Sequence, residues 1–89
     1  MSERYLEVTF RKGKPIAAYI YLLGRAGARS ARTQEMAPGV LVYYGVSGEP
    51  IGLELTAPAE VRLEQINRVL ERLGLENISP EELAPLQPA

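Results

Sequence analysis

The segment from Ala31 to Leu55 constrains the fold of this chain most strongly. It reads ARTQEMAPGVLVYYGVSGEPIGLEL, in which two turn signals separate three runs rich in apolar residues. In the first turn, Pro38 presets φ to about −65° and Gly39 accepts the positive φ that a type II turn requires next. The second turn covers residues 45–50. The segment therefore predicts three successive antiparallel strands.

Two further strands are predicted before this segment. Leu6, Val8 and Phe10 alternate with polar residues, which is the period of a strand with one buried face. A turn containing Gly13 follows, and residues 16–23 are then enriched in β-branched and aromatic side chains. We expect these two strands to pair as a hairpin. The fold class is thus α+β, with a mainly antiparallel, five-stranded β-meander over about residues 5–56.

The middle strands differ in the side chains they offer. The strand over residues 29–36 has a polar centre, so we expect it on an exposed edge or a solvated face. In the strand that follows Gly39, Val40 and Val42 point one way while Leu41 and Tyr43 point the other. Both faces of that strand are apolar, so it is expected inside the sheet.

An amphipathic helix is predicted over about residues 58–73. Apolar residues recur there at helical spacing, namely Leu63, Ile66, Leu70 and Leu73. Thr56 or Ala57 is the expected N-cap, with Pro58 in the first turn, and Gly74 suits a left-handed C-terminal cap. We expect this one helix to pack on one face of the sheet.

The C-terminal residues 79–89 are expected to form a short turn and a tail. Ser79 and Glu82 have the spacing of a capping box, and Pro85 should end the turn soon after it begins. Leu83 and Leu86 are expected to tether the tail. No repeat or linker divides the sequence, so residues 1–89 are predicted to form a single domain.

Composition narrows the chemistry available to this chain. It contains no Cys, His or Asp, so it has no disulfide, no thiolate or imidazole metal ligand and no conventional catalytic triad. We predict no catalytic residue, no cofactor and no metal. Glu35 and Glu54 could converge as paired carboxylates of a glutamate-dependent hydrolase, or both could simply keep a solvated face soluble.

The location expected from the sequence is cytoplasmic. The N-terminal residues carry Glu3, Arg4 and Glu7 and lack the apolar centre of a secretory signal. The longest uncharged run covers residues 36–48, which is well short of the roughly 20 residues needed to cross a bilayer. No membrane association is predicted.

Charge is unevenly distributed along the chain. Residues 1–32 contain seven basic and two acidic residues, a balance of +5, whereas residues 33–89 contain three basic and nine acidic residues, a balance of −6. The two values sum to the net charge of −1. The basic half could bind nucleic acid or an acidic partner, or the two halves could neutralise each other in the fold.

Four segments carry a resemblance to a known family. They are Ala18-Tyr19-Ile20-Tyr21-Leu22, Ala31-Arg32-Thr33-Gln34-Glu35, Pro38-Gly39-Val40-Leu41-Val42-Tyr43-Tyr44 and Ile51-Gly52-Leu53-Glu54-Leu55. In order and spacing the chain resembles a family of small bacterial proteins catalogued as a domain of unknown function. The resemblance implies a β-meander with a C-terminal helix, no assigned activity, and a conceivable antitoxin-like partner role. Family members often carry acidic residues where this chain has residues 44–47 (Tyr-Gly-Val-Ser), so an ion-binding role does not transfer.

The sheet has two faces and the chain has one predicted helix to cover them, so a protein partner is predicted on the second face. One helix covers only one side of a five-stranded sheet, while two strands are apolar on both sides, so a symmetric homo-oligomer, with a dimer favoured, is expected to cover the other side. Tyr19, Tyr21 and Tyr43 are the candidate interface residues. A different protein is the alternative partner.

The second functional hypothesis is a small nucleic-acid-binding protein. Arg25, Arg29 and Arg32 would form a basic patch, and the same tyrosines would supply a stacking platform.

Overall fold

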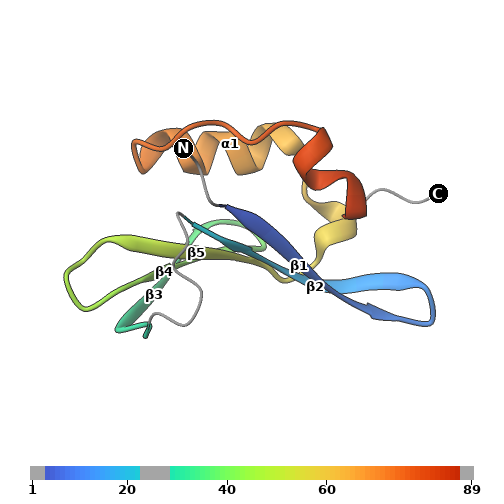
Figure 1. The fold of residues 1–89 in the computed structure, drawn as a ribbon, viewed down its shortest axis with the longest axis horizontal. Coiled ribbons are helices and arrows are strands. Elements are labelled where there is room, and N and C mark those ends of the chain that lie inside the picture. Colours follow the sequence, from blue (N-terminus) through green and yellow to red (C-terminus); the bar gives the residue numbers. More distant parts are fainter. Residues whose placement is uncertain (1–3, 23–28, 87–89) are drawn as a thin grey trace.

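The computed structural model describes residues 4–22 and 29–86 and confirms the α+β architecture (Figure 1). Five antiparallel strands form one sheet, and a single α-helix follows them among the described residues. The elements in chain order are β1 (Tyr5–Arg11), β2 (Lys14–Tyr21), β3 (Arg32–Ala37), β4 (Val40–Tyr44), β5 (Pro50–Leu55), the 3-10 turn η1 (Pro58–Glu60), α1 (Leu63–Arg72) and the 3-10 turn η2 (Glu81–Leu86).

The strands lie in the order β1-β2-β5-β4-β3. The predicted hairpin of β1 and β2 forms, β3 lies at an edge, and β4 lies inside the sheet, as expected from their side chains. The last strand, β5, is central because it pairs with both β2 and β4. The meander of β3, β4 and β5 thus joins the hairpin through its final strand, and β2 and β3 are not neighbours.

The predicted helix over residues 58–73 is divided in two. Pro58 begins the short turn η1, Val61 and Arg62 are extended, and α1 begins only at Leu63. The expected N-cap at Thr56 or Ala57 is therefore wrong for α1. Its start is fixed instead by the Gln65 side-chain oxygen, which accepts the Arg62 backbone N–H at 2.8 Å.

The predicted end of α1 is confirmed. Gly74 has a φ of 75°, in the left-handed region that glycine adopts without steric cost. The Leu75 N–H donates to the Leu70 carbonyl at 2.9 Å and the Gly74 N–H to the Glu71 carbonyl at 3.0 Å, so carbonyls of the last turn are satisfied.

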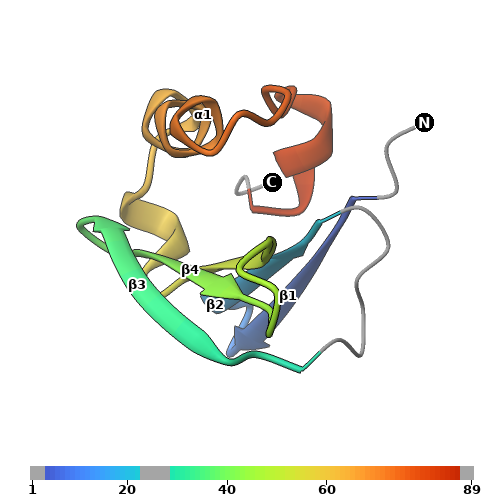
Figure 2. The same ribbon diagram turned by 90° about the vertical axis from the view of Figure 1, so that its left-hand side faces the viewer.

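The helical elements all pack on the same face of the sheet (Figure 2). The core between the layers is entirely apolar among the described residues. The side chains of Ile20, Val42 and Leu53 are fully buried there, opposite Ile66 and Leu70 of α1. The sequence prediction that the helix covers one sheet face is therefore correct.

Hydrogen bonds tie the segment after α1 back to the rest of the fold. Asn67 of α1 brackets the Ile78 backbone, accepting its N–H at 2.6 Å and donating to its carbonyl at 3.2 Å. The capping box predicted at Ser79 and Glu82 forms, with the Glu82 carboxylate accepting the Ser79 N–H at 2.9 Å. Leu83 of η2 is buried and Leu86 packs beside it, as predicted for the tether. Residues 87–89 lie outside the described part.

Candidate interaction surface on the open sheet face

The sheet face opposite α1 carries three half-buried tyrosine side chains, Tyr19, Tyr21 and Tyr43. In antiparallel strands, paired residues point to the same side and successive residues alternate. We call this side the tyrosine face and define it by the strand positions that share it. These positions are Glu7, Thr9, Ala17, Tyr19, Tyr21, Thr33, Glu35, Leu41, Tyr43, Gly52 and Glu54.

Three tyrosine rings pack against one another on this face. The Tyr19 ring lies edge to face with Tyr21, at a centroid distance of 4.7 Å, and with Tyr43, at 5.5 Å. Each of the three side chains is half-buried. The candidate interface residues identified in the sequence are thus brought together into one cluster, although they come from two strands that are not adjacent.

Gly52 makes this cluster possible. It lies in β5 between Tyr21 and Tyr43, and the Tyr19 side chain crosses above it. A Cβ atom at position 52 would lie 1.9 Å from the Tyr19 hydroxyl oxygen, far inside any allowed contact. Absence of a side chain at this position is therefore required for the observed placement of the Tyr19 ring.

Two of the phenols are hydrogen-bonded to glutamates. The Tyr43 hydroxyl donates to Glu54 at 2.5 Å, and the Tyr21 hydroxyl donates to Glu7 at 2.8 Å. The bond to Glu54, with partial burial and the negative charge of Glu54, raises the pKa of Tyr43 to about 12. Burial, followed by the charge of Glu54, also raises the pKa of Tyr19. The negative charge of Glu54 contributes to both pKa shifts, after burial for Tyr19 and after the hydrogen bond and burial for Tyr43.

The acidic residues form a line across the whole sheet. Register pairs Glu7 with Tyr19, Tyr19 with Glu54, Glu54 with Leu41, and Leu41 with Glu35. We call this line of positions the glutamate row. It alternates a carboxylate with an apolar or aromatic side chain from β1 at one edge to β3 at the other.

The glutamate pair considered for catalysis does not converge. Glu35 and Glu54 share the glutamate row, but Leu41 lies between them in the register. Glu54 accepts the Tyr43 hydroxyl, and Glu35 accepts the Gly39 N–H at 3.3 Å. No group of three or more potential metal-ligating side chains occurs within residues 4–22 and 29–86.

Of the residues of the basic patch, Arg32 is not assembled beside the tyrosines. Arg32 pairs with Tyr44 in the register, which places it on the helix side, and its guanidinium lies 4.1 Å from the centroid of the Tyr44 ring. Arg29 is exposed before β3. Arg25 lies outside the described residues. The expected combination of Arg32 with the Tyr19 and Tyr43 platform is therefore wrong, because alternation along β3 and β4 puts them on opposite faces.

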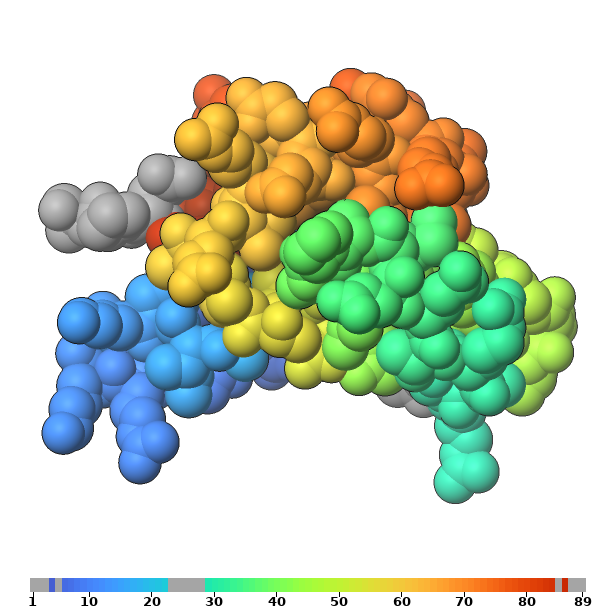
Figure 3. Space-filling view, turned by 180° about the vertical axis from the view of Figure 1, so that it is seen from behind, coloured from blue at the N-terminus to red at the C-terminus, as the bar shows by residue number. Residues whose placement is uncertain are grey.

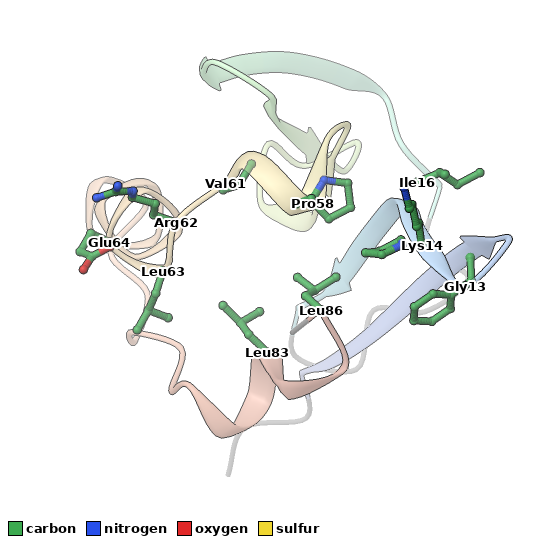
Figure 4. A pocket seen from close by; sticks show the side chains of 13 residues that line it. Gly13, Lys14, Ile16, Pro58, Val61, Arg62, Leu63, Glu64, Leu83 and Leu86 are labelled. Carbon is green, nitrogen blue, oxygen red and sulfur yellow. The ribbon is translucent and has the colours of Figure 1, made fainter. Parts of the chain in front are cut away.

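A second feature is an open apolar groove of about 1010 Å³ on the helix side of the sheet. It lies where the β1–β2 hairpin extends beyond the helical layer (Figure 3). Leu63, Leu83 and Leu86 point into it, whereas Arg62 and Glu64 lie on the far side of the helix start (Figure 4). Its lining is mainly aliphatic, so it offers few groups that would orient a ligand.

Two residues of the tyrosine face were not identified as functional candidates from the sequence. Glu7 alternates with Leu6 and Val8, so the sequence shows that Glu7 lies on the opposite side of β1 from these residues. It does not show that Glu7 lies opposite Tyr19. Gly52 alternates with apolar residues in the same way, and only the pairing of β5 with β2 shows that a ring covers it. Strand pairing was the missing information in both cases.

No helix within the described residues is long and apolar enough to span a bilayer. Comparison with models of known protein families, with curated proteins and with solved structures finds no match to this chain.

Proposed function

We propose that this chain is a protein-binding module and that the tyrosine face is its contact surface. The observation that carries the proposal is the packed cluster of Tyr19, Tyr21 and Tyr43 on the sheet face that the helical elements leave open. Tyrosine is enriched at protein interfaces because it combines a large apolar ring with a polar group at its tip.

The cluster is also organised before any partner arrives. The Tyr21 and Tyr43 hydroxyls are held by glutamates, and Tyr19 is held between the other two rings above Gly52. Side chains that are already fixed lose little conformational entropy on binding, so more of the contact energy appears as affinity. A rigid aromatic cluster of this kind supports binding more than it supports catalysis.

The predicted dimer and a different protein are both possible occupants of this face. The placement of Arg32 on the opposite face gives no support to binding of a nucleic acid here. An antitoxin-like role would be one form of binding to a different protein. The experiment below separates self-association from binding to another protein.

Site-specific photocrosslinking tests the proposal. The variant Tyr21→p-benzoylphenylalanine keeps an aromatic ring on the tyrosine face, and the matched variant Arg68→p-benzoylphenylalanine places the same probe at an exposed position of α1. Both are irradiated in cells of the source organism. We expect discrete protein adducts from position 21 and none from position 68.

The adduct mass identifies the partner. A mass of two chains shows the dimer, and any other mass shows a different protein. Equal adducts from both positions, or none from position 21, would contradict the proposed function. Light scattering of the purified chain at low and high salt gives the oligomeric state independently.

A further inference from the structure

We propose that the tyrosine face binds a positively charged protein segment whose arginine or lysine side chains lie along the glutamate row. This inference rests on the proposed function and names the chemistry of the partner. It follows from the charge of the face, from the spacing of its carboxylates and from the aromatic rings between them.

The charge of the face is unbalanced. Three of the positions that define it are glutamates, namely Glu7, Glu35 and Glu54, whereas the basic pair that the register puts on the same side, Arg11 with Lys14, lies at the hairpin end of β1 and β2, outside the glutamate row. Protein interfaces bring surfaces of opposite electrostatic potential together, and like charges placed against each other cost binding free energy. A second copy stacked on this face would add three more carboxylates, and a nucleic acid would add phosphates. A cationic protein segment matches the face best.

The spacing of the carboxylates suits an extended segment that crosses the strands. Glu7 and Glu54 are two strands apart in the register, as are Glu54 and Glu35. Neighbouring strands are about 4.8 Å apart, so the backbone positions of successive glutamates are about 10 Å apart. A segment in the extended polyproline II conformation rises about 3.1 Å per residue with three residues per turn, so cations three residues apart point to the same side about 9 Å apart and match this interval.

The residues between the carboxylates favour a guanidinium in particular. Tyr19 separates Glu7 from Glu54, so a cation that pairs with either carboxylate lies next to an aromatic ring. Arginine stacks on tyrosine while it donates hydrogen bonds in the plane of the guanidinium. The chain itself contains this contact on its other face, where the Arg32 guanidinium lies over Tyr44.

Titration with short peptides, followed by the backbone amide shifts of the isotope-labelled full chain, tests the inference. The probe is the capped hexapeptide Gly-Arg-Ser-Ser-Arg-Gly, with cations three residues apart. The controls are Gly-Arg-Arg-Ser-Ser-Gly, which has the same composition, and Gly-Glu-Ser-Ser-Glu-Gly. We expect saturable shifts around Tyr19 and Glu54, strongest for the probe and absent for the acidic peptide.

Charge-removing variants locate the site. Glu54→Gln and Glu7→Gln keep the shape of the side chain, and each should weaken probe binding by about 2- to 5-fold, the range expected for one exposed ion pair. Glu71→Gln on the exposed side of α1 removes the same charge away from the face and should leave the affinity unchanged. Added salt should weaken binding of the probe.

The inference is overturned if the arginine peptides cause no saturable shifts on the tyrosine face, or if Glu71→Gln weakens binding as much as Glu54→Gln. A preference for a generic oligonucleotide on this face would also overturn it. If photocrosslinking at position 21 still gives adducts in those cases, the proposed function stands and only the cationic partner is wrong. If neither experiment marks the face, both proposals fail.

Discussion

The two faces of the sheet are built from the same five strands and stabilised in different ways. On the helix side, Ile20, Val42 and Leu53 are completely removed from water by α1 and η2. On the tyrosine face the rings are half-buried and are held by ring contacts and by hydroxyl to carboxylate hydrogen bonds. The comparison shows that burial gives the domain its stability, while the open face is organised without being covered.

This comparison predicts that truncation on the helix side has the largest effect. Leu53 is fully buried in β5, next to Gly52 and Glu54 of the tyrosine face. Leu53→Ala should lower the free energy of unfolding by about 2 to 5 kcal/mol, because it removes apolar contacts and leaves a cavity. Urea unfolding followed by circular dichroism measures this loss. A loss no greater than that of a tyrosine-face variant would contradict the proposed division of roles.

An added methyl group on the tyrosine face should have an intermediate effect. Gly52→Ala places a Cβ where the Tyr19 ring now lies, so the ring must move away and leave its contacts with Tyr21 and Tyr43. We expect a loss of about 1 to 3 kcal/mol, together with a change in the near-ultraviolet circular dichroism of the tyrosines.

A double-mutant cycle is the control for that prediction. In a Tyr19→Ala background the clash is absent, so Gly52→Ala should cost much less than it does in the natural chain. Equal costs in the two backgrounds would show that backbone effects, rather than the Tyr19 ring, require glycine at this position.

The smallest effect is expected from the hydrogen bond between Tyr43 and Glu54. Tyr43→Phe should lower the free energy of unfolding by about 1 kcal/mol or less, because the bond is only partly buried. The pKa of Tyr43 is raised from its ordinary value of 10.0 to about 12, so the folded state favours the protonated phenol. The stabilisation is therefore complete below pH 10 and is lost as the pH rises from 10 to about 12.

Absorbance titration of the tyrosines, combined with unfolding at several pH values, measures this dependence. The Tyr43→Phe variant should lack the titration near pH 12 and should lose less stability above pH 10 than the natural chain, because the raised pKa of Tyr19 still contributes there. Titration of Tyr43 at its ordinary pKa would show that Glu54 does not hold the hydroxyl in solution.

Local features of the sequence were sufficient for several parts of the structure. The hairpin of β1 and β2, the reversal at Pro38 and Gly39, the end of α1 at Gly74 and the capping box at Ser79 all depend on residues close together in the chain. The alternation in β4 also put Tyr43 on the opposite side of that strand from Val40 and Val42, whereas the sequence left open which of Tyr21 and Tyr43 faces outward. Such features need no knowledge of distant segments.

The start of α1 and the position of β5 depended on distant contacts. The Thr56 N–H donates to the Gly39 carbonyl at 3.1 Å, which keeps the chain after β5 tied to the β3–β4 turn, and α1 begins only after the extended residues Val61 and Arg62. Gly52 and Glu54 alternate with large apolar residues along β5, which is typical of a strand with one solvated face. Both residues do lie on the open tyrosine face, but at the centre of the sheet, where Tyr19 covers Gly52 and Tyr43 binds Glu54.

The sequence by itself therefore determined the type and order of the main elements, their turns and the alternation of sides along β1, β4 and β5, because these follow from periodicity and from backbone preferences within a few residues. Only the tertiary structure decided which strands are neighbours. That choice created the glutamate row and the tyrosine cluster, since both join residues from strands that are far apart in the chain and that pair through non-local burial of β5.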